Sequence, residues 1–460
     1  MATNGSRGHT GAGATGRSNS LRGARSRSAR YSKLKPGPGR SAEDVAAHQR
    51  GRLQKAMVEL VAEHGYNGVA VAALTNHARV SKRDFYKRFD GKEECFLATY
   101  DLIVSNSVRG ILAAAEGEEE WCERLRLGFL ALAGQVADHP EAARLALVEA
   151  FVAGAVAVER MLHTNRRFEA LVAKDLALAE GHPRLPRLVV KGIVAGGGRV
   201  ARARLLSGDP RQLVLDGDKL MEWALSFCVD DVGRLRGLGV ARPPAPPATV
   251  TALPLGDERA LILAATARLA DKEGYATLTV PRVRAAAGVS RRSFDTHFEG
   301  VGDCFLATLE TFSSRTLDTA APLYFKADDW ASGVHRMVVS LCQHLARDPT
   351  FASLAFLEVF SPGPEAIEWR SEMIAKLAAN LRRGAPPAWQ PSEFAAEASI
   401  GAMWGVIHHF VATGRGPQLP LAAPVLSYLA LAPALGGSAA IDVIVAEVDA
   451  GSNTVRALDR

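Results

Sequence analysis

A short segment, residues 81–89, combines basic and aromatic side chains in a pattern suited to contacting phosphate groups. Phe85 and Phe89 are four residues apart, so on a helix they share one face and can dock that helix on a neighbour. Ser81 stands where a capping residue would begin it. The remaining surface then carries Lys82, Arg83, Tyr86, Lys87 and Arg88. Two short helices joined by a tight turn, with the second basic outside, have the geometry that enters the major groove of double-stranded DNA.

The same pattern occurs a second time at a constant distance along the chain. A shift of 209 residues places Gly65 on Gly274, Phe85 on Phe294 and Trp121 on Trp330, without a gap. Further on the register slips by about two residues. The chain therefore contains two copies of one unit, a first and a second repeat. The second basic helix would present Arg291, Arg292, Ser293 and His297.

Apolar residues recur at helical spacing in both repeats, which predicts an all-α fold. Five prolines in residues 237–256 indicate a linker between the repeats. Residues 1–42 hold nine Lys or Arg and no acid. Because the whole chain has a net charge of only +6, all of its excess positive charge lies in this segment. We expect residues 1–43 to be disordered, because they lack aliphatic side chains. Such a tail is either an arm that binds polyanions or a solubilising segment.

Composition and motifs argue against several classes of protein. The 460 residues are 48% hydrophobic and 23% charged, as in a soluble globular protein. The uncharged apolar run at 150–158 is too short for a bilayer, so we expect no membrane partner and a cytoplasmic, nucleoid-associated protein. Five cysteines without a C-x-x-C pair suggest free thiols. No catalytic, metal or phosphate-loop motif is convincing, so we expect no enzyme and no cofactor; Gly196-Gly197-Gly198 suggests close helix packing.

The order of these features resembles the tetracycline-repressor (TetR) family of transcription regulators. The matching features are an amphipathic helix followed by Gly-Tyr, a short helix, a Gly-Val-Ser turn, an aromatic-anchored helix, a Phe and then a Lys-Glu pair that opens a long helix. The resemblance implies a three-helix DNA-binding domain, a helical ligand-binding domain and dimerisation through the last two long helices. The expected domains are a basic tail (1–43), helix-turn-helix domain 1 (44–100), ligand-binding and dimerisation domain 1 (101–236), the linker (237–256), a degenerate helix-turn-helix domain 2 (257–309) and ligand-binding and dimerisation domain 2 (310–460).

The two repeats depart from the family pattern in different ways. The first has Arg79 where the family favours Gly in the turn, which costs roughly 1 kcal/mol if the residue is left-handed. The second has Asp295 at the place of Tyr86, and Val301 at the place of Lys92, which resembles the family's phosphate clamp. Residues 81–92 carry a net charge of +3, whereas residues 290–301 are neutral. Since repulsion weakens phosphate contacts, we expect the first repeat to bind DNA more strongly.

The resemblance also implies a ligand site in each helical domain. Glu149 and Glu358 lie in apolar runs, where a carboxylate needs either a cationic ligand or an internal partner such as Arg144 or Arg160. Four aromatic residues would line a pocket or pack in the core. The candidate ligand-binding residues are therefore Trp121, Glu149, Phe151, Trp330, Glu358 and Phe360.

The leading hypothesis is a ligand-responsive transcriptional regulator, with repression as the family's default. Its partners would be double-stranded DNA and a small apolar effector. The two repeats would form an intrachain pseudo-dimer, and a further homodimer of the fused chain stays open. The alternative is a helical ligand-binding or scaffold protein that has lost specific DNA binding.

Overall fold

The computed structural model describes residues 41–178, 185–238 and 257–458, and in these ranges it contains helices and no strand. The expected all-α fold is confirmed. Of the tail expected to be disordered (1–43), residues 1–40 lie outside the described residues, as does most of the linker, 239–256. Ala42 and Glu43 are helical, so the predicted end of the tail was a few residues too late. The chain divides into two compact units, and the boundary falls after Thr99.

The N-terminal unit is a three-helix domain followed by the start of a long helix. Its helices are α2 (Ala42–Gly68), α3 (Val71–Ala78), α4 (Lys82–Tyr86) and the first residues of α5 (Lys92–Ala114). Ser41 begins α2 with a reciprocal cap, in which its hydroxyl accepts from the Asp44 N–H and the Asp44 carboxylate accepts from the Ser41 N–H. Gly65 has a left-handed φ of 68°, which breaks the end of α2.

The main unit, from Tyr100 onward, holds the rest of the first repeat and all of the described second repeat. The first repeat continues with α6 (Trp121–Asp138), α7 (Pro140–Arg144), η1 (Leu145–Glu149), α8 (Ala150–Val152), α9 (Ala155–Leu176), α10 (Arg187–Leu206), α11 (Gln212–Leu215), α12 (Gly217–Leu225) and η2 (Asp230–Leu235). The second repeat consists of α13 (Glu258–Glu273), η3 (Tyr275–Thr277), α14 (Val280–Ala287), α15 (Arg291–His297), α16 (Val301–Phe325), α17 (Trp330–Arg347), α18 (Pro349–Phe356), η4 (Glu358–Phe360), α19 (Pro364–Gly384), η5 (Pro387–Trp389), α20 (Glu393–Ala412), η6 (Gly416–Gln418), α21 (Leu419–Leu435) and α22 (Gly437–Leu458).

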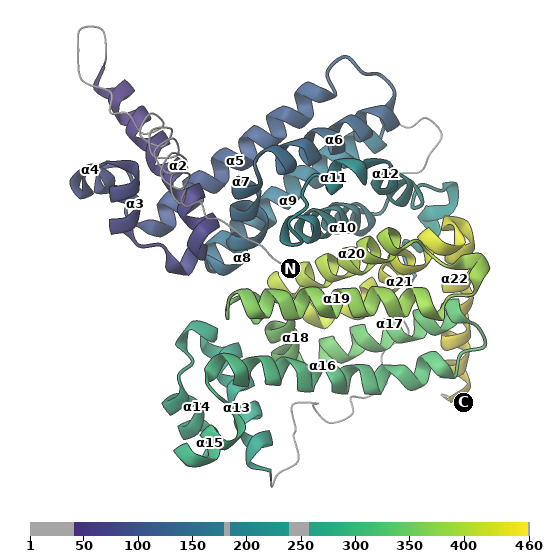
Figure 1. Ribbon diagram of the computed structural model, residues 1–460. Helices are drawn as coiled ribbons and strands as arrows, with labels where there is room; N and C mark the ends of the chain where they lie inside the picture. Colours follow the sequence, from purple (N-terminus) through teal and green to yellow (C-terminus); the bar gives the residue numbers. More distant parts are fainter. Residues whose placement is uncertain (1–40, 179–184, 239–256, 459–460) are drawn as a thin grey trace, which may run out of the picture. The chain divides into compact units, whose positions relative to one another are not determined.

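Helices α10 and α20, which occupy corresponding places in the two repeats, pack side by side in the main unit (Figure 1). Glycines permit this approach. A Cβ added at Gly196 would lie 2.7 Å from the Ala398 carbonyl oxygen, and one added at Gly401 would lie 2.5 Å from the Cβ of Arg199. The predicted close helix packing of Gly196-Gly197-Gly198 is therefore confirmed at Gly196, whereas an added Cβ would meet only Leu220 at 3.9 Å at Gly197 and nothing within 4 Å at Gly198.

Other contacts between the repeats surround this helix pair. Phe151 and Phe360, which the shift of 209 residues superposes, stack with ring centroids 4.0 Å apart. The indole N–H of Trp223 donates to the Ser399 hydroxyl at 3.0 Å, and both residues are buried. A pair of equivalent residues that touch each other is the signature of twofold packing.

The apolar segment around helix α21 is longer than the uncharged apolar run at 150–158. Residues Gly416–Leu435 are long and apolar enough to cross a bilayer by length and composition, which the sequence reasoning overlooked. In the structure 72% of this segment is buried, and the Tyr428 hydroxyl donates to the Phe227 carbonyl at 3.0 Å. Helix α21 thus has the surroundings of a core helix in a folded protein.

Two glycines of α10 provide a matched test of this packing. We expect Gly196→Ala to destabilise the chain by about 1–3 kcal/mol, because its methyl group meets a backbone oxygen that cannot move aside. Gly198→Ala should instead stabilise it by about 0.5–1 kcal/mol, because the new methyl group has open space and alanine favours the helix. Thermal unfolding of the full chain measures both shifts, and shifts of the same sign would contradict the proposed packing.

Candidate DNA-binding and effector sites

Helix α4 is held against the N-terminal unit by its two phenylalanines. The Ser81 hydroxyl accepts from the Asp84 N–H at 3.0 Å and so caps the first turn. Phe85 and Phe89 are almost completely buried, with ring centroids 5.7 Å apart. The sequence spacing therefore positions α4 as expected, with its opposite face in solvent.

Four of the predicted DNA-contacting residues lie on that exposed face: Lys82, Arg83, Tyr86 and Lys87. The Tyr86 side chain is 56% exposed although it is large and aromatic, so it is available to a partner. Lys87 lies 3.4 Å from the Asp84 carboxylate. The hydrogen bond from Ser81, followed by Lys87, lowers the pKa of Asp84 below its usual range. The outer face of α4 is therefore basic with one ionised acid.

Arg88 and Lys92, also predicted to contact DNA, are half-buried and bind the backbone of their own unit. Arg88 donates to the Asp84 carbonyl at 2.7 Å and to the Ala46 carbonyl at 3.3 Å. The Lys92 ammonium donates to the Tyr66 carbonyl at 3.1 Å and lies 4.0 Å from the Tyr66 ring centroid. Burial lowers the pKa of Lys92. In this conformation both side chains brace the domain behind α4.

The turn between α3 and α4 contains a strained residue. Arg79 adopts φ 52° and ψ 41°, the left-handed conformation that the sequence departure implied, whereas Gly288 occupies the equivalent turn at φ 70°. Buried Arg52 donates to the carbonyls of Ala78 and Arg79, at 2.9 Å and 2.6 Å. The second repeat has Leu261 at the position of Arg52. A buried guanidinium thus holds the turn that lacks glycine.

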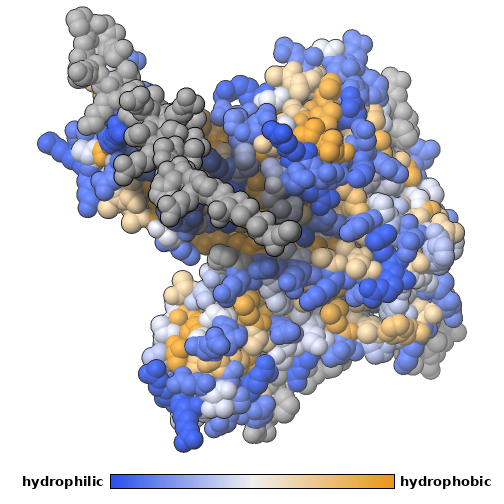
Figure 2. Space-filling view, viewed as in Figure 1, coloured by the Kyte–Doolittle hydropathy of each residue, from blue (hydrophilic) through white to orange (hydrophobic). Residues whose placement is uncertain are grey.

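The second helix-turn-helix has the same scaffold and a different outer face. Ser290 caps α15 by accepting from the Ser293 N–H at 3.0 Å, and Phe294 is fully buried. Arg291 and Arg292 are exposed, but Arg291 pairs with Asp295 at 3.3 Å. In Figure 2 the tip of the molecule at α14 and α15, at lower left, is hydrophilic.

Two further predicted residues of α15 do not lie on its open surface. Ser293 is buried, and its hydroxyl donates to the Glu258 carboxylate at 2.5 Å. His297 is half-buried, with its ring 6.2 Å from that of Phe298. The exposed charge of α15 therefore comes from Arg291, Arg292 and Asp295, so its outer face is less basic than that of α4.

Within the main unit, the second helix-turn-helix is tied to the helical domain behind it. The Glu358 carboxylate in η4 accepts from the Tyr275 backbone N–H at 2.9 Å and from the Ser361 hydroxyl at 3.2 Å. The Thr350 hydroxyl donates to Asp271 at 2.7 Å. Glu358, one of the candidate ligand residues, thus has internal hydrogen-bond donors.

A cavity of about 480 Å³ lies in the main unit, mostly among helices of the first repeat. Helices α5, α6, α9 and α10 and the π-helical turn η1 form most of its wall, and α19 and α20 of the second repeat close it with Arg370, Trp404 and His408. Most of its lining is aliphatic or aromatic. Its size and lining are typical of a site for a small organic molecule.

The other candidate ligand residues are distributed around this cavity and the core. Phe151 lines the cavity, and the ring of Phe360 stacks on the ring of Phe151. Glu149 is buried 3.5 Å from Arg144, so it has the internal partner that the sequence offered as one alternative. Trp330 is buried, and Trp121 is half-buried at the start of α6. Sequence reasoning did not select the buried cations on the cavity wall, Arg199, Arg202 and Arg370.

The described thiols and acids form no evident metal site. Cys95, Cys304 and Cys342 are buried free thiols, and burial raises the pKa of Cys95 to about 12. Cys122 and Cys228 are free and partly buried. Within the described ranges, no three His, Cys, Asp or Glu side chains gather closely enough to hold a metal ion.

Two capped helix pairs with exposed basic side chains on one all-helical chain define a helix-turn-helix protein. The family model described as "Bacterial regulatory proteins, tetR family" matches residues 54–99 and 262–308, the two helix-turn-helix segments. The chain thus carries two TetR-type DNA-binding segments, and these matches support a tandem TetR-like transcriptional regulator.

The chain is also similar to individual proteins that are described as transcription regulators. The HTH-type transcriptional activator FasR of Mycolicibacterium smegmatis (strain ATCC 700084 / mc(2)155) is 28% identical over 184 residues, which cover 39% of this chain and 80% of that protein. The fatty acid degradation regulator FadR from Bacillus halodurans matches with a TM-score of 0.37 and 17% identity, over 42% of this chain and 97% of its own. A TetR-like transcriptional regulator from Rhodococcus sp. RHA1 matches with a TM-score of 0.34 and 18% identity, over 39% and 97%.

The strained turn gives a reciprocal pair of substitutions. Arg79→Gly should raise the free energy of local opening around α3 and α4 by about 1 kcal/mol, because glycine adopts the left-handed conformation without a steric penalty. Gly288→Arg should lower the free energy of local opening around the corresponding turn of the second repeat by a similar amount. Hydrogen exchange of the backbone amides in the full chain measures both, and a loss of protection in Arg79→Gly would contradict the strain.

Proposed function

We propose that the chain is an effector-responsive repressor in which the first helix-turn-helix makes the stronger contact with DNA. The observation that carries the proposal is the difference between the outer faces of α4 and α15. Lys82, Arg83 and Tyr86 are exposed on α4, whereas α15 places Asp295 at the position of Tyr86. A carboxylate repels the phosphate that a tyrosine hydroxyl would hydrogen-bond.

The packing of the main unit supports an intrachain pseudo-dimer. Helices α10 and α20 meet as equivalent elements, and Phe151 stacks on its own counterpart, Phe360. In a fused chain this interface forms at an effective concentration that does not depend on the protein concentration. One chain would thus supply both helix-turn-helix motifs, with the domain boundaries expected from the sequence and with DNA in the cytoplasm as its partner.

The cavity supports the response to an effector. Its wall is built by both repeats, so a bound molecule would contact the helices that hold them together. A ligand shifts a conformational equilibrium only when it interacts differently with the two states. Placement at the interface between the repeats would supply such a difference, and DNA affinity would change with occupancy.

Equivalent residues of the two repeats permit a matched test of the DNA contact. Lys82→Gln with Arg83→Gln should weaken DNA binding more than Arg291→Gln with Arg292→Gln, although each pair removes two basic residues at corresponding positions. The slope of log affinity against log salt should fall by about 0.9 for each phosphate contact removed. Operator DNA selected from a random pool serves as the ligand for affinity measurements at several salt concentrations.

Equal losses in the two double variants would reject the asymmetry. No loss in either, or no sequence preference in the selected pool, would favour the helical ligand-binding or scaffold alternative. A reporter gene with the selected site in its promoter then gives the direction of regulation. Repression lowers its output, whereas an increase would overturn repression and would match the description of the M. smegmatis relative as an activator.

The pseudo-dimer predicts the stoichiometry of the complex. One chain should bind one operator, because the interface between the repeats is already satisfied within the chain. Native mass measurement of the protein with and without operator DNA determines the number of chains in each species. Two chains per operator would contradict the intrachain pair and would favour the further homodimer.

A further inference from the structure

Three buried arginines from the two repeats line the cavity. Arg199 and Arg202 come from α10 and Arg370 comes from α19, and all three line the cavity wall. Their exposed fractions are only 4%, 9% and 3%. Burial, followed by the nearby Arg199, lowers the pKa of Arg202, and burial, followed by Arg202 and Arg199, lowers that of Arg370. A buried guanidinium cluster of this kind is costly unless anions balance it.

The partners of these arginines leave positive charge uncompensated. Arg199 lies 3.4 Å from Glu397, which it shares with Arg204. Arg202 donates to the Leu147 carbonyl at 2.8 Å, in the π-helical turn η1. Arg370 lies over the rings of Phe360 and Trp404, and its Nε and Nη1 have no hydrogen-bond partner among the described residues.

The remaining charged groups around the cavity are already paired or are uncharged. Lys191 and Glu169 are 2.6 Å apart, and Arg124 and Asp175 are 3.0 Å apart. Burial, followed by the nearby Arg370 and Arg202, lowers the pKa of His408 to about 3, so this imidazole is neutral at pH 7. In the described ranges, no carboxylate forms an ion pair with Arg202 or Arg370.

We propose that the cavity binds an amphipathic acid, whose single oxyanion head lies against Arg202 and Arg370 and whose apolar body fills the first-repeat part of the cavity. Guanidinium groups bind carboxylates and phosphates through strong charge-assisted hydrogen bonds. The apolar lining fits the rest of such a molecule. This inference rests on the proposed response to an effector and replaces a purely apolar effector with an acidic one.

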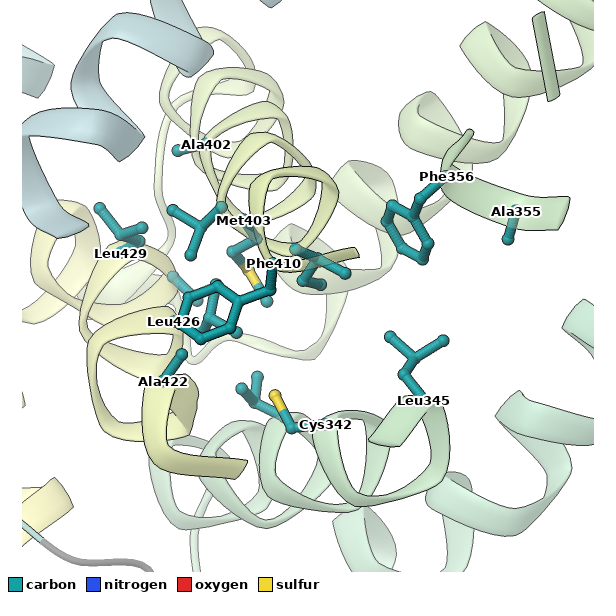
Figure 3. Packing of buried hydrophobic residues seen from close by; sticks show 14 of the residues in the cluster. Cys342, Leu345, Ala355, Phe356, Ala402, Met403, Phe410, Ala422, Leu426 and Leu429 are labelled. Carbon is teal, nitrogen blue, oxygen red and sulfur yellow. The ribbon is translucent and has the colours of Figure 1, made fainter. Parts of the chain in front are cut away.

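The second repeat fills the corresponding space with larger side chains. The shift of 209 residues places Phe351 on Ala142, Phe356 on Leu147 and Leu345 on Val136, and the three first-repeat residues line the cavity. Phe351, Phe356 and Leu345 are buried, and Figure 3 shows Phe356 and Leu345 directed into the packed core with Cys342. We therefore expect one acid molecule per chain, held by residues of both repeats.

Calorimetric titration of the full chain in the absence of DNA tests the site. The probes are dodecanoate, dodecyl phosphate and 1-dodecanol, below the concentrations at which they form micelles. The better of the two acids should bind about 10- to 100-fold more tightly than the alcohol, with one site per chain. The comparison between the two acids shows whether a carboxylate or a phosphate head is preferred.

Substitution on α19 then assigns the head group. Arg370→Gln should cost the acid at least about tenfold in affinity and leave the alcohol unchanged. Arg370→Lys, which keeps the charge, should recover part of the loss. Arg383→Gln on the exposed surface of the same helix is the matched control and should change nothing.

Equal binding of acid and alcohol to the unaltered chain would overturn the proposal without reference to any variant. Equal effects of Arg370→Gln and Arg383→Gln would also overturn it, and two molecules per chain would overturn the single shared site. Failure here is distinguishable from failure of the proposed function. An acid that binds and leaves operator affinity unchanged refutes effector control and retains the site, whereas operator binding without acid binding refutes the site alone.

Discussion

The close approach of α10 and α20 is the contact on which the main unit depends. Without side chains at Gly196 and Gly401 the two helices approach closely, and the ring of Trp223 from α12 fits against Gly196 and donates to Ser399 of α20. The same approach places Arg199 and Arg202 of α10 beside Trp404 and His408 of α20 on one cavity wall. An interface built for stability therefore also buries charge, and buried charge is rarely retained in a protein core without a partner. The contact that joins the repeats therefore also forms part of the cavity wall.

The sequence predicted local structure well, because its signals are local. Ser81 and Ser290 both cap helices, and Gly274 ends α13 with a left-handed φ of 80°. The strain at Arg79 could be anticipated because the resembling family favours glycine in this turn, as the second repeat has at Gly288.

What sequence reasoning could not supply depends on packing between elements distant in the chain. Nothing local shows that Ser293 turns toward Glu258, 35 residues earlier, or that Lys92 donates to Tyr66. The arginines of the cavity give only a weak signal, a basic residue within an apolar helical pattern. Arg370 reaches the wall through the fold of a second repeat, so its role depends on the tertiary structure. The apolar length of α21 was overlooked in the sequence, and its burial becomes visible only in the fold.

Fusion of two repeats in one chain removes the requirement that both partners be identical. In a symmetric dimer, a substitution appears on both sides of the interface. Here Met161 and Arg370 occupy equivalent positions, and both line the same cavity from opposite repeats, one apolar and one charged. Such a site binds an asymmetric molecule with different ends in different repeats. The outer faces of α4 and α15 can differ for the same reason, because a substitution in one motif does not change the other.

One short segment, η4, contacts two residues of the cavity wall and also the second helix-turn-helix. Phe360 of this turn contacts both Phe151 and Arg370, whereas Glu358, two residues earlier, accepts from the backbone of Tyr275. A group that draws the Arg370 guanidinium away from the Phe360 ring would act on the same turn that anchors α13 and η3. Packed contacts of this kind can carry energetic coupling between two sites when both bias the same two-state element. Because the turn spans only three residues, displacement of Phe360 cannot be absorbed along a flexible loop before it reaches Glu358.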